Sequence, residues 1–191
     1  MAMLILGLVL FLGVHSVRIV ADGWRSAQIA QRGEGLWKGL CTVASLAGFG
    51  LIVWGYGQAR GAPVVLWAPM AWTRHAAALL MLLAFVLLAA AYVPRNAIKA
   101  RLHHPMLLAT KAWALAHLLA NNTLADVLLF GSFLVWAAFS FRAARQRDRA
   151  AGTVYPPGTV AGTVSAVTAG VLACAVFIYW AHQALFGVKP M

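Results

Sequence analysis

Charge is scarce in this 191-residue chain: only 10% of the residues are Asp, Glu, Lys or Arg. A soluble domain carries about 25% charged residues, so this composition excludes an ordinary water-soluble domain. Cysteine is scarce as well, with only Cys41 and Cys174, and no CxxC pair occurs. A disulfide framework and a cysteine-based zinc site are therefore excluded, and both thiols are expected to lie within helices.

Acidic residues are the rarest class of all, four against 15 Lys and Arg, which leaves a net charge of +11. Such a charge invites a nucleic-acid interpretation. The basic residues, however, are not gathered on one face or in one module, as such proteins require. They lie in the short connections between apolar runs, which is where membrane proteins carry them. The expected partner is the lipid bilayer, with no nucleic acid.

Long apolar runs fill the rest of the chain, in which 63% of the residues are hydrophobic. About 20 consecutive apolar residues cross the hydrocarbon core of a bilayer. The sequence predicts a polytopic, all-α membrane helix bundle that forms one domain over residues 1–191. About six transmembrane helices are expected, over residues 2–21, 38–58, 71–93, 103–121, 123–141 and 163–186.

The distribution of Lys and Arg predicts the orientation of these helices. The connections after the first, third and fifth helices hold ten basic residues: Arg25, Arg32, Lys38, Arg95, Lys99, Arg101, Arg142, Arg145, Arg147 and Arg149. The opposite side holds Arg60, Arg74 and Lys189. Because basic loops stay in the cytoplasm, both termini are expected on the outer side. The first run lacks a basic n-region and a cleavage site, which indicates a retained helix.

Histidines are unusually frequent in or near the apolar runs, at His15, His75, His104, His117 and His182. Imidazole ligates haem iron, and helical bundles build such sites from side chains on facing helices. One interpretation is therefore a haem b held by two histidines from different helices. The other is that the imidazoles form hydrogen bonds between helices, as polar groups in bilayers commonly do.

Polar and aromatic neighbours make two of these histidines the best candidates. Arg18 lies one turn from His15 and is placed either to pair with a haem propionate or to snorkel from the helix end. Trp113 lies one turn before His117 and is placed to pack on a porphyrin. Lys111 is expected at mid-membrane, where it must find a partner or shift its pKa.

Two further histidines, His103 and His104, open the fourth apolar run beside Pro105, which is tolerated in the first turn of a helix. His104 is a candidate for the same cofactor site, or an interfacial residue next to Arg101. Depth in the membrane also limits the pairing. At 1.5 Å per residue, His15 lies about 9 Å from the cytoplasmic end and His117 about 20 Å. Depth alone favours His15 with His104, or His117 with His75 or His182.

The stretch HPMLLATKAWALAHLLANNTLADVLLFGSF, with VHSVR before it and GTVYPPGTVAGTVSAV after it, resembles the NnrU family of bacterial membrane proteins. Members are often encoded with denitrification genes, and the family includes a haem b enzyme, the plastid 15-cis-zeta-carotene isomerase. The resemblance covers the whole chain. It implies a multi-pass protein of the bacterial inner membrane, with both termini in the periplasm, and a haem whose iron ligands match His15 and His117.

The resemblance also limits the function that can be expected. The isomerase has a cysteine inside its WCxAH motif, where this chain has Ala114. A further histidine after the isomerase's second helix has no counterpart in WGYGQARG. Isomerase activity therefore does not follow from the resemblance. The haem is expected either to act in redox-gated isomerisation of a lipophilic molecule or to respond to nitric oxide.

Two other functions fit the sequence. An R-x-H-H-P helix entry is similar to that of isoprenylcysteine-type membrane methyltransferases, but no acidic pair follows the last helix. A scaffold or accessory protein without chemistry would use the same histidines as structural hydrogen-bonding groups. Such a protein would be colourless when purified, whereas a haem protein would not.

Overall fold

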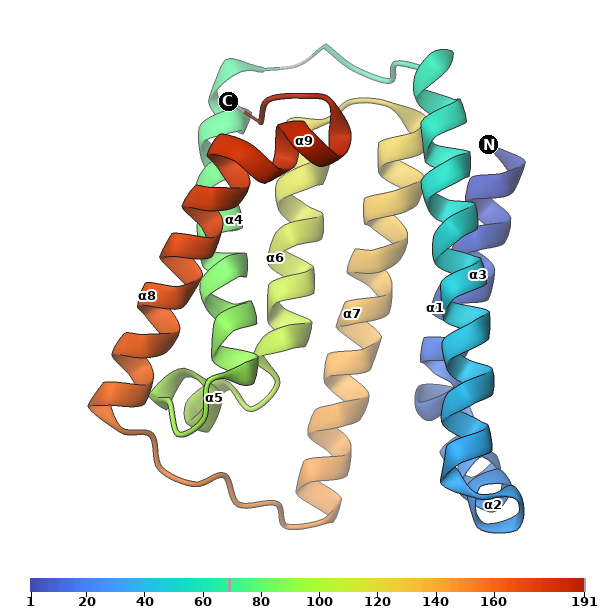
Figure 1. Cartoon of the computed structure of the whole chain (residues 1–191), viewed down its shortest axis with the longest axis vertical. Helices are drawn as coiled ribbons and strands as arrows, with labels where there is room; N and C mark the ends of the chain where they lie inside the picture. Colours follow the sequence, from blue (N-terminus) through green and yellow to red (C-terminus); the bar gives the residue numbers. More distant parts are fainter. Residues whose placement is uncertain (69, 191) are drawn as a thin grey trace. The chain divides into compact units, whose positions relative to one another are not determined.

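The computed structural model describes residues 1–68 and 70–190, apart from the side chain of Ala71. Over these residues the chain is all-α, and extended backbone forms only two isolated bridges. The helices are α1 (Ala2–Val20), α2 (Asp22–Arg32), α3 (Glu34–Gly61), α4 (Ala71–Tyr92), α5 (Ala97–Leu102), α6 (Pro105–Ala120), α7 (Leu124–Ala150) and α8 (Val160–Val176) (Figure 1). A π-helical turn, η1 (Phe177–Ala181), continues α8 into α9 (His182–Phe186).

Five of the described helices are long and apolar enough to cross a membrane: α1, α3, α4, α7 and the continuous helix from α8 to α9. Large apolar side chains on them are exposed, such as Val9, Leu79 and Leu172. In water such surfaces would be costly, whereas lipid covers them. The fourth predicted helix, α6, has 16 residues and spans about 24 Å at 1.5 Å per residue. The fold is the expected membrane helix bundle.

The helices differ from the predicted ranges mainly in the connections. Helix α7 continues to Ala150, so Arg142–Arg149 lie on a helix and not in a loop. Alanine, arginine and glutamine are strong helix formers, so α7 continues beyond the end of its apolar segment. Helices α2 and α5 lie in segments too short or too polar to be expected as spans.

The chain divides into two compact units. The first holds residues 1–68 and 122–140, and the second residues 69–121 and 141–191. In the first unit α1 packs along α3. The two backbones come so close that a Cβ atom on Gly7 would lie 2.6 Å from the Ile52 nitrogen. Small residues allow such contacts between membrane helices, where packing replaces the hydrophobic effect.

In the second unit α4 packs against both α6 and α8. The turn after α4 is fixed by Asn96, whose buried side-chain amide donates to the carbonyls of Ala90 and Val93 at 2.9 and 2.6 Å. Its side-chain oxygen accepts a hydrogen bond from the backbone nitrogen of Lys99 at 2.8 Å and so caps α5. The turn therefore sets where α5 and then α6 begin.

Candidate functional site

A cavity of about 310 Å³ lies within the second unit. Its size falls at the lower end of the range for small-molecule sites, about 300–1,000 Å³. It is formed by the first half of α4, the end of α6, the π-helical turn with α9, and the chain after α9. The lining residues are Arg74, Ala77, Ala78, Met81, Ala116, His117, Ala120, Asn121, Ile178, His182, Val188, Lys189 and Pro190.

His182 reaches this cavity through two local features of the chain. The π-helical turn just before it adds a residue to the helix, as such turns often do at functional sites. After α9, Gly187 adopts a left-handed conformation with φ +72°, which suits glycine and turns the chain back. The carbonyl of Val188 then lies 2.8 Å from His182 Nδ1. Since a carbonyl only accepts, Nδ1 carries the proton and Nε2 keeps the lone pair that binds metals.

His117 lies in the last turn of α6, where the helix ends at Asn121. The Asn121 amide nitrogen donates to the His117 carbonyl at 2.9 Å and lies 3.4 Å from His117 Nδ1. Trp113, one turn earlier, meets the imidazole edge-on at 5.5 Å between ring centroids. Metal binding through Nε2 would need the proton on Nδ1, and Asn121 would then have to turn its amide oxygen towards the ring.

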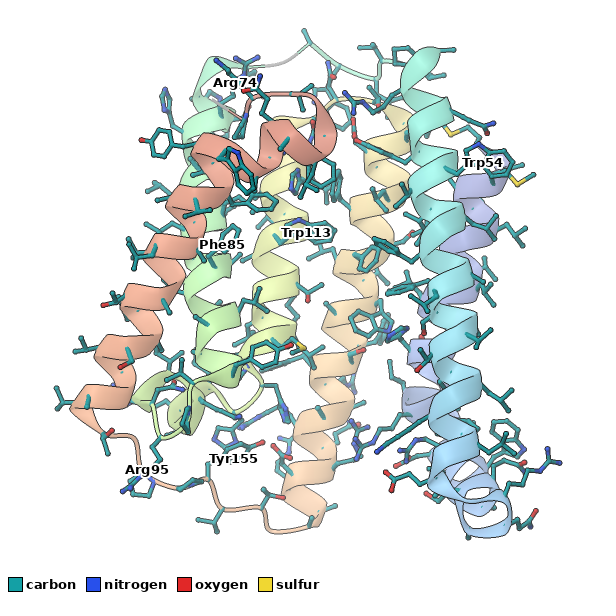
Figure 2. The ribbon with its side chains drawn as sticks, viewed as in Figure 1. Trp54, Arg74, Phe85, Arg95, Trp113 and Tyr155 are labelled. Carbon is teal, nitrogen blue, oxygen red and sulfur yellow. The ribbon has the colours of Figure 1, made fainter. Side chains whose placement is uncertain are left out.

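Arg74 and Lys189 give the cavity its charge, and most of the other lining side chains are apolar. An apolar cavity with imidazoles and cations suits a ligand that has an apolar body and anionic groups. Arg74 lies at the end of the second unit where α4 begins, and Arg95 and Tyr155 lie at its opposite end (Figure 2).

His15 and Arg18 belong to α1 in the first unit. His15 Nδ1 lies 2.7 Å from the Phe11 carbonyl, so its Nε2 also keeps the metal-binding lone pair. Its ring stacks on Phe11 at 4.4 Å and meets Trp136 edge-on at 6.1 Å. Arg18 lies 3.9 Å from Asp22 in an exposed ion pair. The imidazole of His15 therefore has the orientation that a metal ligand needs.

His104 lies at the end of the second unit that faces away from the cavity, just before α6. Its Nε2 lies 2.8 Å from Asp148 Oδ2, and the Tyr155 hydroxyl donates to the same oxygen at 2.9 Å. Burial and this hydrogen bond raise the pKa of Tyr155 above its ordinary value. His103 packs against Tyr155 with ring centroids 4.2 Å apart and the rings tilted by 45°. The cluster ties the start of α6 to the end of α7 and the loop beyond, and the carboxylate accounts for the orientation of His104.

Lys111 also finds a partner within the second unit. Its Nζ lies 4.3 Å from the centre of the Phe141 ring, in a cation–π contact. His104 forms a T-shaped contact with the same ring, at 6.2 Å between ring centroids. The lysine charge is therefore directed towards the end of α6 that carries His104, and Lys111 is not among the residues that line the cavity.

Residues 3–190 match the family model described as NnrU protein, which is nearly the whole chain. The chain belongs to the NnrU family. Neither a curated protein nor a solved structure matches it significantly. The family resemblance found in the sequence is thereby confirmed, whereas the relation to the carotene isomerase is not tested by these comparisons.

The NnrU family chain also holds a buried carboxylate that the sequence reasoning missed. Asp126 is 4% exposed, and it accepts from the Tyr56 hydroxyl at 2.5 Å. Its other oxygen accepts from the nitrogen and hydroxyl of Thr123 at 3.0 and 2.6 Å. The signal was present as T-x-x-D before an apolar run, which is a capping box at the start of α7. The hydrogen bond from Tyr56 links α3 to the start of α7 within the first unit.

Three polar cavity residues were also missed as members of a site. Asn121 belongs to the helix-breaking sequence NNT at residues 121–123. Arg74 and Lys189 were considered only in the count of basic residues that predicts the orientation. Their separation along the chain gives no pattern that a sequence motif could reveal. Only the folded second unit brings them to one cavity with His117 and His182.

Proposed function

We propose that this NnrU family chain is a haem b protein of the membrane, with the haem bound in the cavity of the second unit. One observation carries the proposal: His117 and His182 line the same cavity, within an otherwise mostly apolar wall. Two imidazoles from different helices are the usual ligand set for a low-spin haem in a helical bundle. The hydrogen bond from His182 Nδ1 to Val188 supports the orientation that such a ligand needs.

His15 remains a competing partner for His117, because the family resemblance assigns it and its own hydrogen bond orients it equally well. The sequence-based depth argument allowed either His75 or His182 as the partner of His117. The cavity supports the same choice, since both imidazoles belong to one compact unit. We therefore take His117 and His182 as the proposed iron ligands, and the variants below discriminate between the two pairs.

When bound, haem b would supply one-electron redox chemistry and, after loss of one axial ligand, a position for nitric oxide or another small molecule. The chain's own residues would hold the ligand orientation and exclude water from the cavity. The setting that fits the family resemblance is the bacterial inner membrane, in cells that reduce nitrite and nitric oxide. The distribution of basic residues supports periplasmic termini.

Haem content of single variants tests the proposal. The protein is expressed with added haem precursor, purified in detergent, and assayed for haem per chain. His117→Ala and His182→Ala are expected to lose most of the haem, because each removes an iron ligand. His75→Ala is the matched control, since His75 is exposed, lies on α4 and does not line the cavity.

The His15→Ala variant separates the two ligand pairs. Full haem retention in this variant, with loss in His182→Ala, supports the cavity of the second unit. The reverse pattern supports the pair suggested by the resemblance. Full retention in His117→Ala would contradict both pairs.

A further inference from the structure

Two basic residues of the second unit stand apart from the others. Among its described residues, Arg95, Lys99, Arg101, Arg142, Arg145, Arg147 and Arg149 lie at the end that carries His104. The positive-inside rule accounts for this accumulation. Arg74 lies at the opposite end, where α4 begins (Figure 2), and Lys189, in the chain after α9, lines the same cavity. The rule gives no reason for cations there.

Both of these cations line the same cavity, although 115 positions separate residues 74 and 189 in the chain. No salt bridge to either is found among residues 1–68 and 70–190. Two positive charges on one mostly apolar cavity repel each other, and an anionic ligand bound between them would replace this repulsion by attraction. The pair therefore indicates a ligand with carboxylate or similar groups at one edge.

Haem b has this chemistry, because its macrocycle is apolar and its two propionates leave from one edge. We infer that Arg74 and Lys189 bind the propionates of the haem held in this cavity. This inference rests on the proposed function. The sequence offered Arg18 as one candidate for that role, but Arg18 lies in the first unit beside Asp22. The guanidinium of arginine can donate two parallel hydrogen bonds to one carboxylate, whereas the ammonium of lysine acts as a point charge. The two propionates would therefore be bound by different kinds of contact.

Haem dimethyl ester provides the test, because it keeps the macrocycle and iron but lacks both carboxylate charges. The full-length protein is purified without haem, and both ligands are titrated while the Soret band is recorded. Wild-type protein is expected to bind haem more tightly than the ester, by about tenfold for each charge-assisted contact. Arg74→Gln and Lys189→Gln should each weaken haem binding about tenfold and leave ester binding unchanged.

Two further variants guard against effects on folding or on overall charge. Arg95→Gln removes the same charge from the opposite end, where the side chain is exposed, and should change neither affinity. Lys189→Arg keeps the charge and should restore most of the preference for haem.

The possible failures are distinguishable. A preference for haem that persists undiminished in Arg74→Gln and Lys189→Gln would overturn the inference and leave the haem proposal standing. Equal weakening of haem and ester in these variants would also overturn it, since the side chains would then act on the fold and not on the carboxylates. Failure of the wild-type protein to bind either compound would contradict the proposed function itself.

Discussion

A close approach of α1 and α3 in the first unit predicts a large effect from one methyl group. Gly7 on α1 faces the backbone of α3, and an added Cβ would lie 2.6 Å from Ile52 N, 2.8 Å from Gly48 O and 2.9 Å from Leu51 C. All three atoms belong to the backbone of a helix, so none can turn away as a side chain would. Gly7→Ala therefore has to separate α1 from α3.

The size of the effect follows from two opposing contributions. Overpacking a close contact costs about 1–3 kcal/mol. Replacing glycine by alanine within a helix stabilises it by roughly 0.5–1 kcal/mol, and this gain offsets part of the cost. Gly13 is a matched control on the same helix, because nothing lies within 4 Å of a Cβ added there. Gly13→Ala should show the gain alone, so the two variants should differ by about 1–3 kcal/mol.

Equilibrium unfolding in mixed detergent micelles, followed by circular dichroism, measures this difference. Gly13→Ala should unfold at a higher denaturant fraction than wild-type protein, and Gly7→Ala at a lower one. Equal stability of the two variants would refute the inferred contact between the α1 and α3 backbones.

Four other predictions follow from the contacts within each unit. Tyr56→Phe should cost about 1–3 kcal/mol of unfolding free energy because it removes a donor from buried Asp126, whereas exposed Tyr92→Phe should be nearly neutral in the same assay. Asn121→Ala should weaken haem binding roughly 10–100-fold in a Soret titration if its amide orients His117, and an unchanged affinity would count against that role. The pKa of Tyr155 is raised in the folded protein, so the protonated hydroxyl stabilises the fold. This stabilisation is complete below the ordinary tyrosine pKa of about 10 and is lost as the pH rises through the raised pKa. Tyr155→Phe should therefore abolish part of the alkaline loss of stability seen in unfolding curves across pH. A reporter fused to the C-terminus should behave as periplasmic, and a cytoplasmic signal would contradict the assigned orientation.

The membrane fold could be predicted from the sequence because it depends on the length of apolar runs. The run that forms α4, for example, ends within one residue of its expected range. The short helices could not be predicted in this way, since α2 is too polar for a span and α5 has only six residues. The end of α7 was misplaced because helix formation by Arg and Ala continues after the hydrophobic signal has stopped.

The site was less accessible to sequence reasoning than the fold. His117 was singled out by its aromatic neighbour and its depth, and His182 only as one of several partners that depth allowed. Their common cavity depends on the turn at Gly187, which returns Val188 and Lys189 to α4 and α6. Such a tertiary return leaves no periodic pattern. Lys111 was expected to need a partner, but no sequence pattern identifies the Phe141 ring as that partner.

Binding of haem b through His117 and His182 can be tested with the visible spectrum of the detergent-purified protein. The spectrum is recorded oxidised and after reduction with dithionite, from cells supplied with haem during expression, and a pyridine haemochrome assay identifies the haem. We expect stoichiometric haem b, with a sharp Soret band and resolved α and β bands on reduction, as two imidazole ligands produce. A folded but colourless protein would contradict it and would favour a scaffold without a cofactor.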